Sequence, residues 1–133
     1  MAAMNLKRLL SSGVYVRSRK YMKHHQIQYI EFLSNNFDSI KEFYQNTFGW
    51  KFTDYGPEYT AFAGEGVPGG FAPGTPVKGS ILVIIYSGDL EGSKKSVVKS
   101  GGSIVHDIFS FPGGRRFHFI DSDGNELAVW SDT

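Results

Sequence analysis

The stretch FIDSDGNELAVW, residues 119–130, combines a tight turn with a strand whose two faces differ. The Asp-Ser-Asp-Gly-Asn run is typical of a turn, because Asp and Asn accept local backbone hydrogen bonds and Gly tolerates positive φ. In the strand that follows, alternation places Leu127 and Val129 on one face. The second face holds a carboxylate, a methyl group and an indole, which belong to Glu126, Ala128 and Trp130. The sequence therefore predicts that the two faces meet different surroundings.

The composition limits the classes of protein to which the chain can belong. Its 133 residues fit one domain, and 41% hydrophobic and 15% aromatic residues are typical of a folded globule. The absence of cysteine excludes disulfides, thiolate metal sites and cysteine nucleophiles. No apolar run approaches the roughly 20 residues that cross a bilayer, so we expect no membrane partner.

Basic residues gather at the N-terminus. Residues 1–22 are basic and hydroxyl-rich and contain no acid, which leaves an acidic excess elsewhere and argues against a nucleic-acid partner. This composition is typical of a mitochondrial presequence; the alternatives are a disordered leader or an upstream start, with Met22 as the effective first residue. We expect one domain at residues 23–133, and a cytoplasmic location unless the leader is a presequence.

The first half of the chain is expected to contain a strand, a helix and short strands. The strand is predicted at residues 27–33 by alternation. Asn36 or Asp38 can cap the helix, and Gly49 ends it. The next strands are predicted at residues 51–54 and 58–62. The glycine-rich stretch that follows, residues 63–79, is interpreted as a crossover between units, either a plain linker or a lid.

The second half repeats this plan. Asn36 corresponds to Asp89, and Gly49 corresponds to Gly102. The predicted strands lie at residues 81–86, 103–107, 116–120 and 126–130. The fold class is therefore α+β, with two β-α-β-β-β modules at about residues 25–74 and 79–133.

One such module covers one face of its sheet with a helix and leaves the other face bare. Two modules are therefore expected to join into a curved mixed sheet with a cup-shaped pocket. By alternation, the residues that line this pocket are Tyr29, Glu31, Leu82, Ile84, Tyr86, Glu126, Ala128 and Trp130.

This plan resembles the vicinal oxygen chelate superfamily, which includes glyoxalase, bleomycin-resistance, fosfomycin-resistance and extradiol dioxygenase proteins. The resemblance rests on FYQNTFGW at residues 43–50 and DSDGNE at residues 121–126, and it covers about residues 25–132. The chain is more similar still to a glyoxalase-related bacterial branch that has an aromatic residue two places before Glu in the first strand, as in Tyr29 and Glu31. That branch also has FPGGRRFHF, here residues 111–119.

The resemblance implies a metal position that this chain does not supply with ligands. Metal-dependent members hold a divalent ion with His, Gln or Glu at equivalent strand positions of both modules. Those positions fall here on Tyr29, Leu82 and Ala128, and the fourth lies in the glycine-rich stretch. Because these are not normal ligands for a divalent cation, we expect no metal cofactor there and no lactoylglutathione lyase activity.

Three residues are the candidate catalytic groups. Glu31 and Glu126 can act as general acid or base if buried, or form salt bridges at the rim. His118 lies in mid-strand, where a structural histidine is the more common case, although histidine titrates near neutral pH and binds metals. A relocated metal site formed by Glu31, His118 and Glu126 is the alternative to a metal-free pocket. His106, at a strand end, is a weaker candidate.

Two arginines are candidates for anion binding. Arg115 and Arg116 follow the turn at residues 112–114, which can present guanidinium groups to a carboxylate or phosphate. Solvated arginines are the alternative.

The resemblance implies a lyase or isomerase of the glyoxalase-like type that works by proton transfer on a small molecule in an apolar pocket. The alternatives are a protein that sequesters a small molecule without chemistry, and a metal enzyme with shifted ligands. Modules of this kind commonly pair across chains, so a homodimer is expected. The sequence specifies neither substrate nor reaction.

Overall fold

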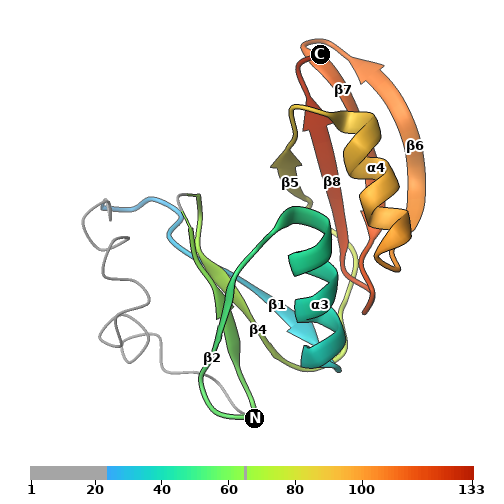
Figure 1. Ribbon diagram of the computed structural model, residues 1–133. Coiled ribbons are helices and arrows are strands. Elements are labelled where there is room, and N and C mark those ends of the chain that lie inside the picture. The colour runs from blue at the N-terminus through green and yellow to red at the C-terminus, as the bar shows by residue number, and fades with distance from the viewer. Residues whose placement is uncertain (1–23, 65) are drawn as a thin grey trace.

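The structure, a computed structural model, describes residues 24–64 and 66–133. These residues form two units, each with one helix on one face of a four-stranded sheet (Figure 1). The predicted leader at residues 1–22 lies outside the described residues. Within the described ranges, no helix is long and apolar enough to cross a membrane.

The first unit has the strand order β1-β4-β3-β2, in which β1 is parallel to β4 and the other neighbours are antiparallel. The α-helix begins after Asn36, whose side chain accepts a hydrogen bond from the backbone N–H of Ser39, and ends at Gly49 with a φ of 73°. The elements are β1 (Ile30–Ser34), α3 (Phe37–Phe48), β2 (Phe52–Asp54), β3 (Thr60–Phe62) and β4 (Gly69–Pro73).

The second unit repeats this order, as β5-β8-β7-β6 with β5 parallel to β8. Asp89 caps its helix by accepting a hydrogen bond from the backbone N–H of Gly92 at 3.0 Å. The elements are β5 (Val83–Tyr86), α4 (Leu90–Lys99), β6 (Ser103–Phe111), β7 (Gly114–Ile120) and β8 (Glu126–Ser131). The predicted α+β fold with two β-α-β-β-β modules is confirmed.

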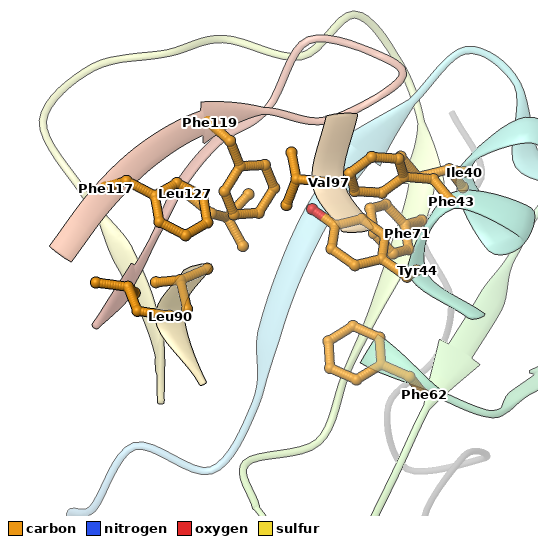
Figure 2. Close-up of a cluster of buried hydrophobic side chains, with 11 residues drawn as sticks. Ile40, Phe43, Tyr44, Phe62, Phe71, Leu90, Val97, Phe117, Phe119 and Leu127 are labelled. Carbon is orange, nitrogen blue, oxygen red and sulfur yellow. The ribbon is translucent and has the colours of Figure 1, made fainter. Parts of the chain in front are cut away.

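The two units share one hydrophobic core. On the sheet faces that α3 and α4 cover, the strands present apolar side chains, and the helices supply the apolar side chains that pack against them (Figure 2). The buried members of this cluster come from both units; they are Ile40, Phe43, Tyr44, Phe62, Phe71, Leu90, Val97, Phe117, Phe119, Leu127 and Val129. Because this core fills one side of each sheet, the opposite sides are left for other contacts.

The turn between β7 and β8 joins the two units. Asp121, which is 4% exposed, accepts hydrogen bonds from the backbone N–H groups of residues 123–125. Its carboxylate also accepts one from the Tyr44 hydroxyl of α3 at 2.9 Å. Asn125 donates to the backbone oxygen of Leu33 in β1 at 3.1 Å. The predicted turn therefore also fixes the start of β8 against β1.

The interpretation of residues 63–79 as a crossover is wrong for Gly69–Pro73. Within this stretch β4 pairs with both β1 and β3, so it lies inside the first sheet. Glycine and proline disfavour strands, which hid β4 in the sequence. Glycine is needed there because a Cβ at Gly69 would overlap the backbone oxygen of Ile30.

Candidate functional site

The open face of the second sheet, which is the face turned away from α4, carries Glu126, Ala128 and Trp130 of β8. Trp130 contacts Tyr86 edge to face, with 5.3 Å between ring centroids. Ala128 is fully buried and lies opposite Ile84 of β5 on one side and His118 of β7 on the other. Strand β8 therefore lies between the core and this second, aromatic surface.

The open face of the first sheet, turned away from α3, carries a chain of hydroxyl groups that ends on Glu31. Tyr59 is buried and donates a hydrogen bond to Oε1 of Glu31 at 2.9 Å. Its hydroxyl oxygen lies 2.5 Å from the hydroxyl of Tyr29. Since Tyr59 gives its proton to Glu31, Tyr29 donates to Tyr59. This arrangement orients the Glu31 carboxylate.

Gly70 leaves the space in which the two tyrosine hydroxyls lie. In the first sheet Glu31 lies opposite Gly70, just as Ile84 lies opposite Ala128 in the second, so Gly70 is the counterpart of Ala128. A Cβ at Gly70 would lie 2.5 Å from the hydroxyl oxygen of Tyr59. A side chain there, whether ligand or not, would displace the hydroxyl chain.

The metal position implied by the resemblance does not fit a divalent ion in this chain. The fourth residue of that metal position is Gly70, and the other three are Tyr29, Leu82 and Ala128. Glycine, leucine and alanine side chains offer no donor atom, and the remaining Tyr29 hydroxyl donates to Tyr59. Any chemistry at this site therefore rests on other residues.

A pocket of about 300 Å³ separates β1 from β5 and the start of β8. Glu31 and Glu126 both line it, together with Lys78. Its other lining residues are mostly apolar: Ile30, Phe32, Leu33, Val77, Ile81, Val83 and Asn125. The structure thus brings the two predicted carboxylates to one hollow.

His118 and Glu126 lie side by side at the second sheet. Nδ1 of His118 is 3.4 Å from Oε2 of Glu126, and His118 is only 9% exposed. Its Nε2 atom is buried and has no hydrogen-bond partner among the described residues. The third member of this group is His106, whose ring packs edge to face on His118 with centroids 4.8 Å apart. Glu31, which the sequence grouped with His118 and Glu126, is not in this cluster.

The sequence placed His106 at a strand end, but β6 continues to Phe111 and is irregular on both sides of His106. Ile104 lies opposite Phe119, which packs in the core, and plain alternation would turn His106 the same way as Ile104. The next pair is His106 with His118. From the first pair to the second, β6 advances two residues while β7 moves back only one. Such a β-bulge redirects a side chain and leaves no clear signal in the hydrophobic pattern. Tyr59 was missed for a simpler reason, because its partner Glu31 lies on a distant strand.

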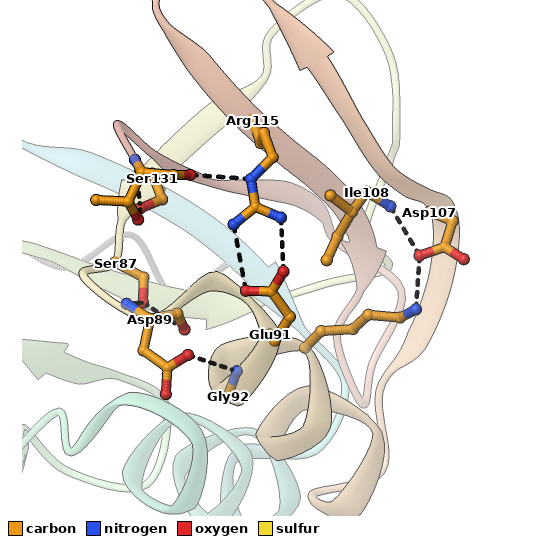
Figure 3. Close-up of polar contacts among 10 residues, drawn as sticks. Ser87, Asp89, Glu91, Gly92, Asp107, Ile108, Arg115 and Ser131 are labelled. Carbon is orange, nitrogen blue, oxygen red and sulfur yellow. Dashed lines mark hydrogen bonds and ion pairs between the residues drawn. The ribbon is translucent and has the colours of Figure 1, made fainter.

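The two predicted arginines face opposite sides of β7. Arg115 forms an ion pair with Glu91 of α4, which raises the pKa of the guanidinium and lowers the pKa of the Glu91 carboxyl (Figure 3). Arg116 lies on the open face, 5.3 Å from the ring centroid of Phe109 and 5.7 Å from that of Phe111. Arg115 therefore supports α4, and only Arg116 is placed near the candidate site.

Known proteins resemble this chain in sequence or in fold. A "Glyoxylase-like domain-containing protein" of Didymella fabae is 30% identical over 122 residues, which cover 80% of this chain and 93% of that protein. A glyoxalase-related enzyme from Fulvimarina pelagi has a TM-score of 0.70 at 19% identity, covering 81% of this chain and 88% of its own. Lactoylglutathione lyase from Agrobacterium tumefaciens has a TM-score of 0.64 at 16% identity, covering 82% and 95% of the two chains.

These structural likenesses concern the fold. The sequence itself matches the profile of the Glyoxalase/Bleomycin resistance protein/Dioxygenase superfamily over residues 26–129, which include every strand and helix described above except the last residues of β8. By sequence and by module architecture, the chain is a member of the glyoxalase/bleomycin resistance protein/dioxygenase superfamily.

Proposed function

We propose that the protein is a lyase or isomerase of the glyoxalase-like type, with Glu31 as its proton-transfer group. The observation that carries this proposal is the hydroxyl chain that holds the Glu31 carboxylate at the pocket between β1 and β8. Likeness in fold to a lactoylglutathione lyase supports the class of reaction. The unsuitable residues at the superfamily's metal position argue for a reaction that does not use that position.

The geometry around Glu31 suits a base. Tyr59 binds Oε1, whereas Oε2 accepts no hydrogen bond from any described residue. One carboxylate oxygen is therefore fixed while the other remains available for a substrate proton. Hydrogen bonds in a series polarise one another, so the Tyr29 hydroxyl strengthens the contact that Tyr59 makes with Glu31. Glu31 is exposed, so a proton that it takes from carbon can exchange with bulk water.

The one basic residue among the described residues that line the pocket indicates the substrate class. Lys78 lines the same hollow and forms no ion pair within the described ranges. It can therefore pair with a carboxylate or phosphate of the substrate. A small molecule with an anionic group and an acidic C–H beside a carbonyl fits this arrangement, because Lys78 binds one end and Glu31 accepts the proton.

Solvent deuterium exchange tests the proposal with small probe molecules that carry the required acidic C–H. Small 2-oxo acids such as 2-oxobutyrate are incubated with the protein in D₂O, and loss of the C–H signal beside the carbonyl is followed by ¹H NMR. Wild-type protein is expected to accelerate this exchange. Glu31→Gln keeps the size of the side chain but removes the base, so it should abolish the acceleration and retain binding. Glu42→Gln, on the exposed side of α3, is the matched control and should behave as wild type.

Two outcomes would overturn the proposed chemistry. Binding of the 2-oxo acids without any exchange would favour the sequestering protein, which needs the pocket but no base. Equal exchange by wild type and Glu31→Gln would remove Glu31 from the reaction.

The homodimer stays a prediction, for which Ile84 and Tyr86 offer exposed apolar surface.

A further inference from the structure

We propose that His106, His118 and Glu126 bind a divalent transition-metal ion, such as Zn²⁺, on the open face of the second sheet. One ligand atom from each residue can be chosen so that all three lie within 4.8 Å of one another. Zinc at roughly 2.0–2.2 Å from each ligand in tetrahedral geometry requires ligand atoms about 3.3–3.5 Å apart. Small side-chain rotations therefore suffice to close the three donors on one ion.

The strand register brings these ligands together from three adjacent strands. His106 lies opposite His118 in the pairing of β6 with β7. His118 lies opposite Ala128 in the pairing of β7 with β8, so Glu126 is a diagonal neighbour on the same face. Rigid strands on both sides of His118 thus hold the three residues. The β-bulge before His106 is what turns its ring to this face.

The state of His118 is the second observation that points to a ligand. Its Nε2 atom is buried and no described residue provides it with a hydrogen bond, although buried ring nitrogens are normally paired. Its Nδ1 atom lies 3.4 Å from Glu126, at the long limit for a hydrogen bond. Neither ring nitrogen of His118 therefore has a short hydrogen bond to a described residue, and a cation bound to one of them would satisfy that nitrogen.

The donor set selects the class of ion. Two imidazoles and one carboxylate suit Zn²⁺, Co²⁺, Ni²⁺ or Fe²⁺, whereas Mg²⁺ and Ca²⁺ prefer sites built from oxygen ligands. Three protein ligands leave a coordination position for water or for a bound molecule.

This site is distinct from the position that the superfamily implies. That position includes Ala128, whereas the proposed ligand His118 stands on the neighbouring strand, directly opposite Ala128. Glu126 also lines the pocket that contains Glu31, so the ion would lie at the end of that pocket. The inference does not depend on the proposed role of Glu31, because Glu31 is outside the ligand group.

Metal titration of protein freed of ions by a chelator tests the inference. Co²⁺ is added and its visible absorption is followed, because a site with nitrogen ligands and low coordination number gives intense bands. Zn²⁺ affinity is then measured by calorimetry. Wild-type protein is expected to bind one Co²⁺ or Zn²⁺ per chain at micromolar concentrations and to bind no Mg²⁺. His106→Ala and Glu126→Gln should each weaken binding by at least about tenfold.

The controls separate this site from surface binding and from the proposed reaction. His24→Ala removes an exposed histidine outside the cluster and should leave affinity unchanged. Glu31→Gln should also bind metal as wild type does, even though it is expected to lose deuterium exchange. Because His118 is buried, circular dichroism of every variant verifies folding, and the test uses His106 and Glu126 instead. Wild type without a bound ion, or folded ligand variants that bind equally well, would overturn the inference.

Discussion

Replacing Tyr44 by phenylalanine removes one hydroxyl from the buried contact between α3 and the turn after β7. Tyr44 is fully buried, and its hydroxyl donates to Oδ2 of Asp121 at 2.9 Å. Phenylalanine retains the ring, so no large cavity forms. Asp121 keeps its bond from Asn125 and those from three backbone N–H groups. The loss is therefore one hydrogen bond to a carboxylate, which lowers the free energy of unfolding at pH 7 by about 1.5–3 kcal/mol.

The same replacement has a distinct effect at alkaline pH. Burial, followed by the charge and hydrogen bond of Asp121, raises the pKa of Tyr44 well above its usual value of about 10. A raised folded pKa contributes stability that is present below pH 10 and is lost as the pH rises, because the unfolded chain ionises first. Wild type should lose about 1.4 kcal/mol by pH 11 through this group. Tyr44→Phe has no hydroxyl to ionise and lacks this loss. The difference in free energy of unfolding between wild type and Tyr44→Phe should therefore be smaller at pH 11 than at pH 7.

Urea unfolding at pH 7 and pH 11, followed by tryptophan fluorescence, measures both effects. Trp50 stacks on Tyr44 with 4.6 Å between ring centroids and so reports on this region. Tyr86→Phe is the matched control, because the exposed Tyr86 hydroxyl also donates to an aspartate, Asp132. Loss of this exposed bond should lower the free energy of unfolding far less. A difference between wild type and Tyr44→Phe below about 0.5 kcal/mol at pH 7 would refute the reasoning. So would a difference that is the same at both pH values.

Two further replacements test the contacts that shape the pocket. Gly70→Ala should destabilise the fold by about 1–3 kcal/mol, because the new Cβ would lie 2.5 Å from the Tyr59 hydroxyl oxygen; combining it with Tyr59→Phe should recover part of this loss. Thermal unfolding of the four proteins in this cycle measures the coupling, and strictly additive losses would contradict it. Asn125→Ala removes the donor to Leu33 and Asp121 and should lower the free energy of unfolding in urea by about 1–3 kcal/mol. An unchanged urea midpoint would contradict a stabilising role for these two bonds.

Local signals in the sequence predicted most of the architecture. Asn36 and Asp89 cap the two helices, and Gly49 ends the first in a left-handed conformation. These features depend on side chains that bond within a few residues, so they can be recognised before the fold is determined. The repeated order of elements in turn predicted two modules of one class.

Signals that depend on distant strands were misread. Strand β4 is rich in glycine and proline, and it is a strand because β1 and β3 pair with it on both sides. Arg115 and Arg116 were grouped by adjacency, but alternation sends Arg115 to Glu91 and Arg116 to the open face. In each case the decisive partner lies far away along the chain.

The candidate site divides in the same way. The sequence by itself determined that Glu126, Ala128 and Trp130 share the second face of β8, because alternation is a property of any extended strand. Only the tertiary structure decided which groups meet that face, since the bulge in β6 turns His106 toward His118 against simple alternation. Local backbone geometry is encoded within a few residues, whereas the register between strands is set by packing of the whole sheet.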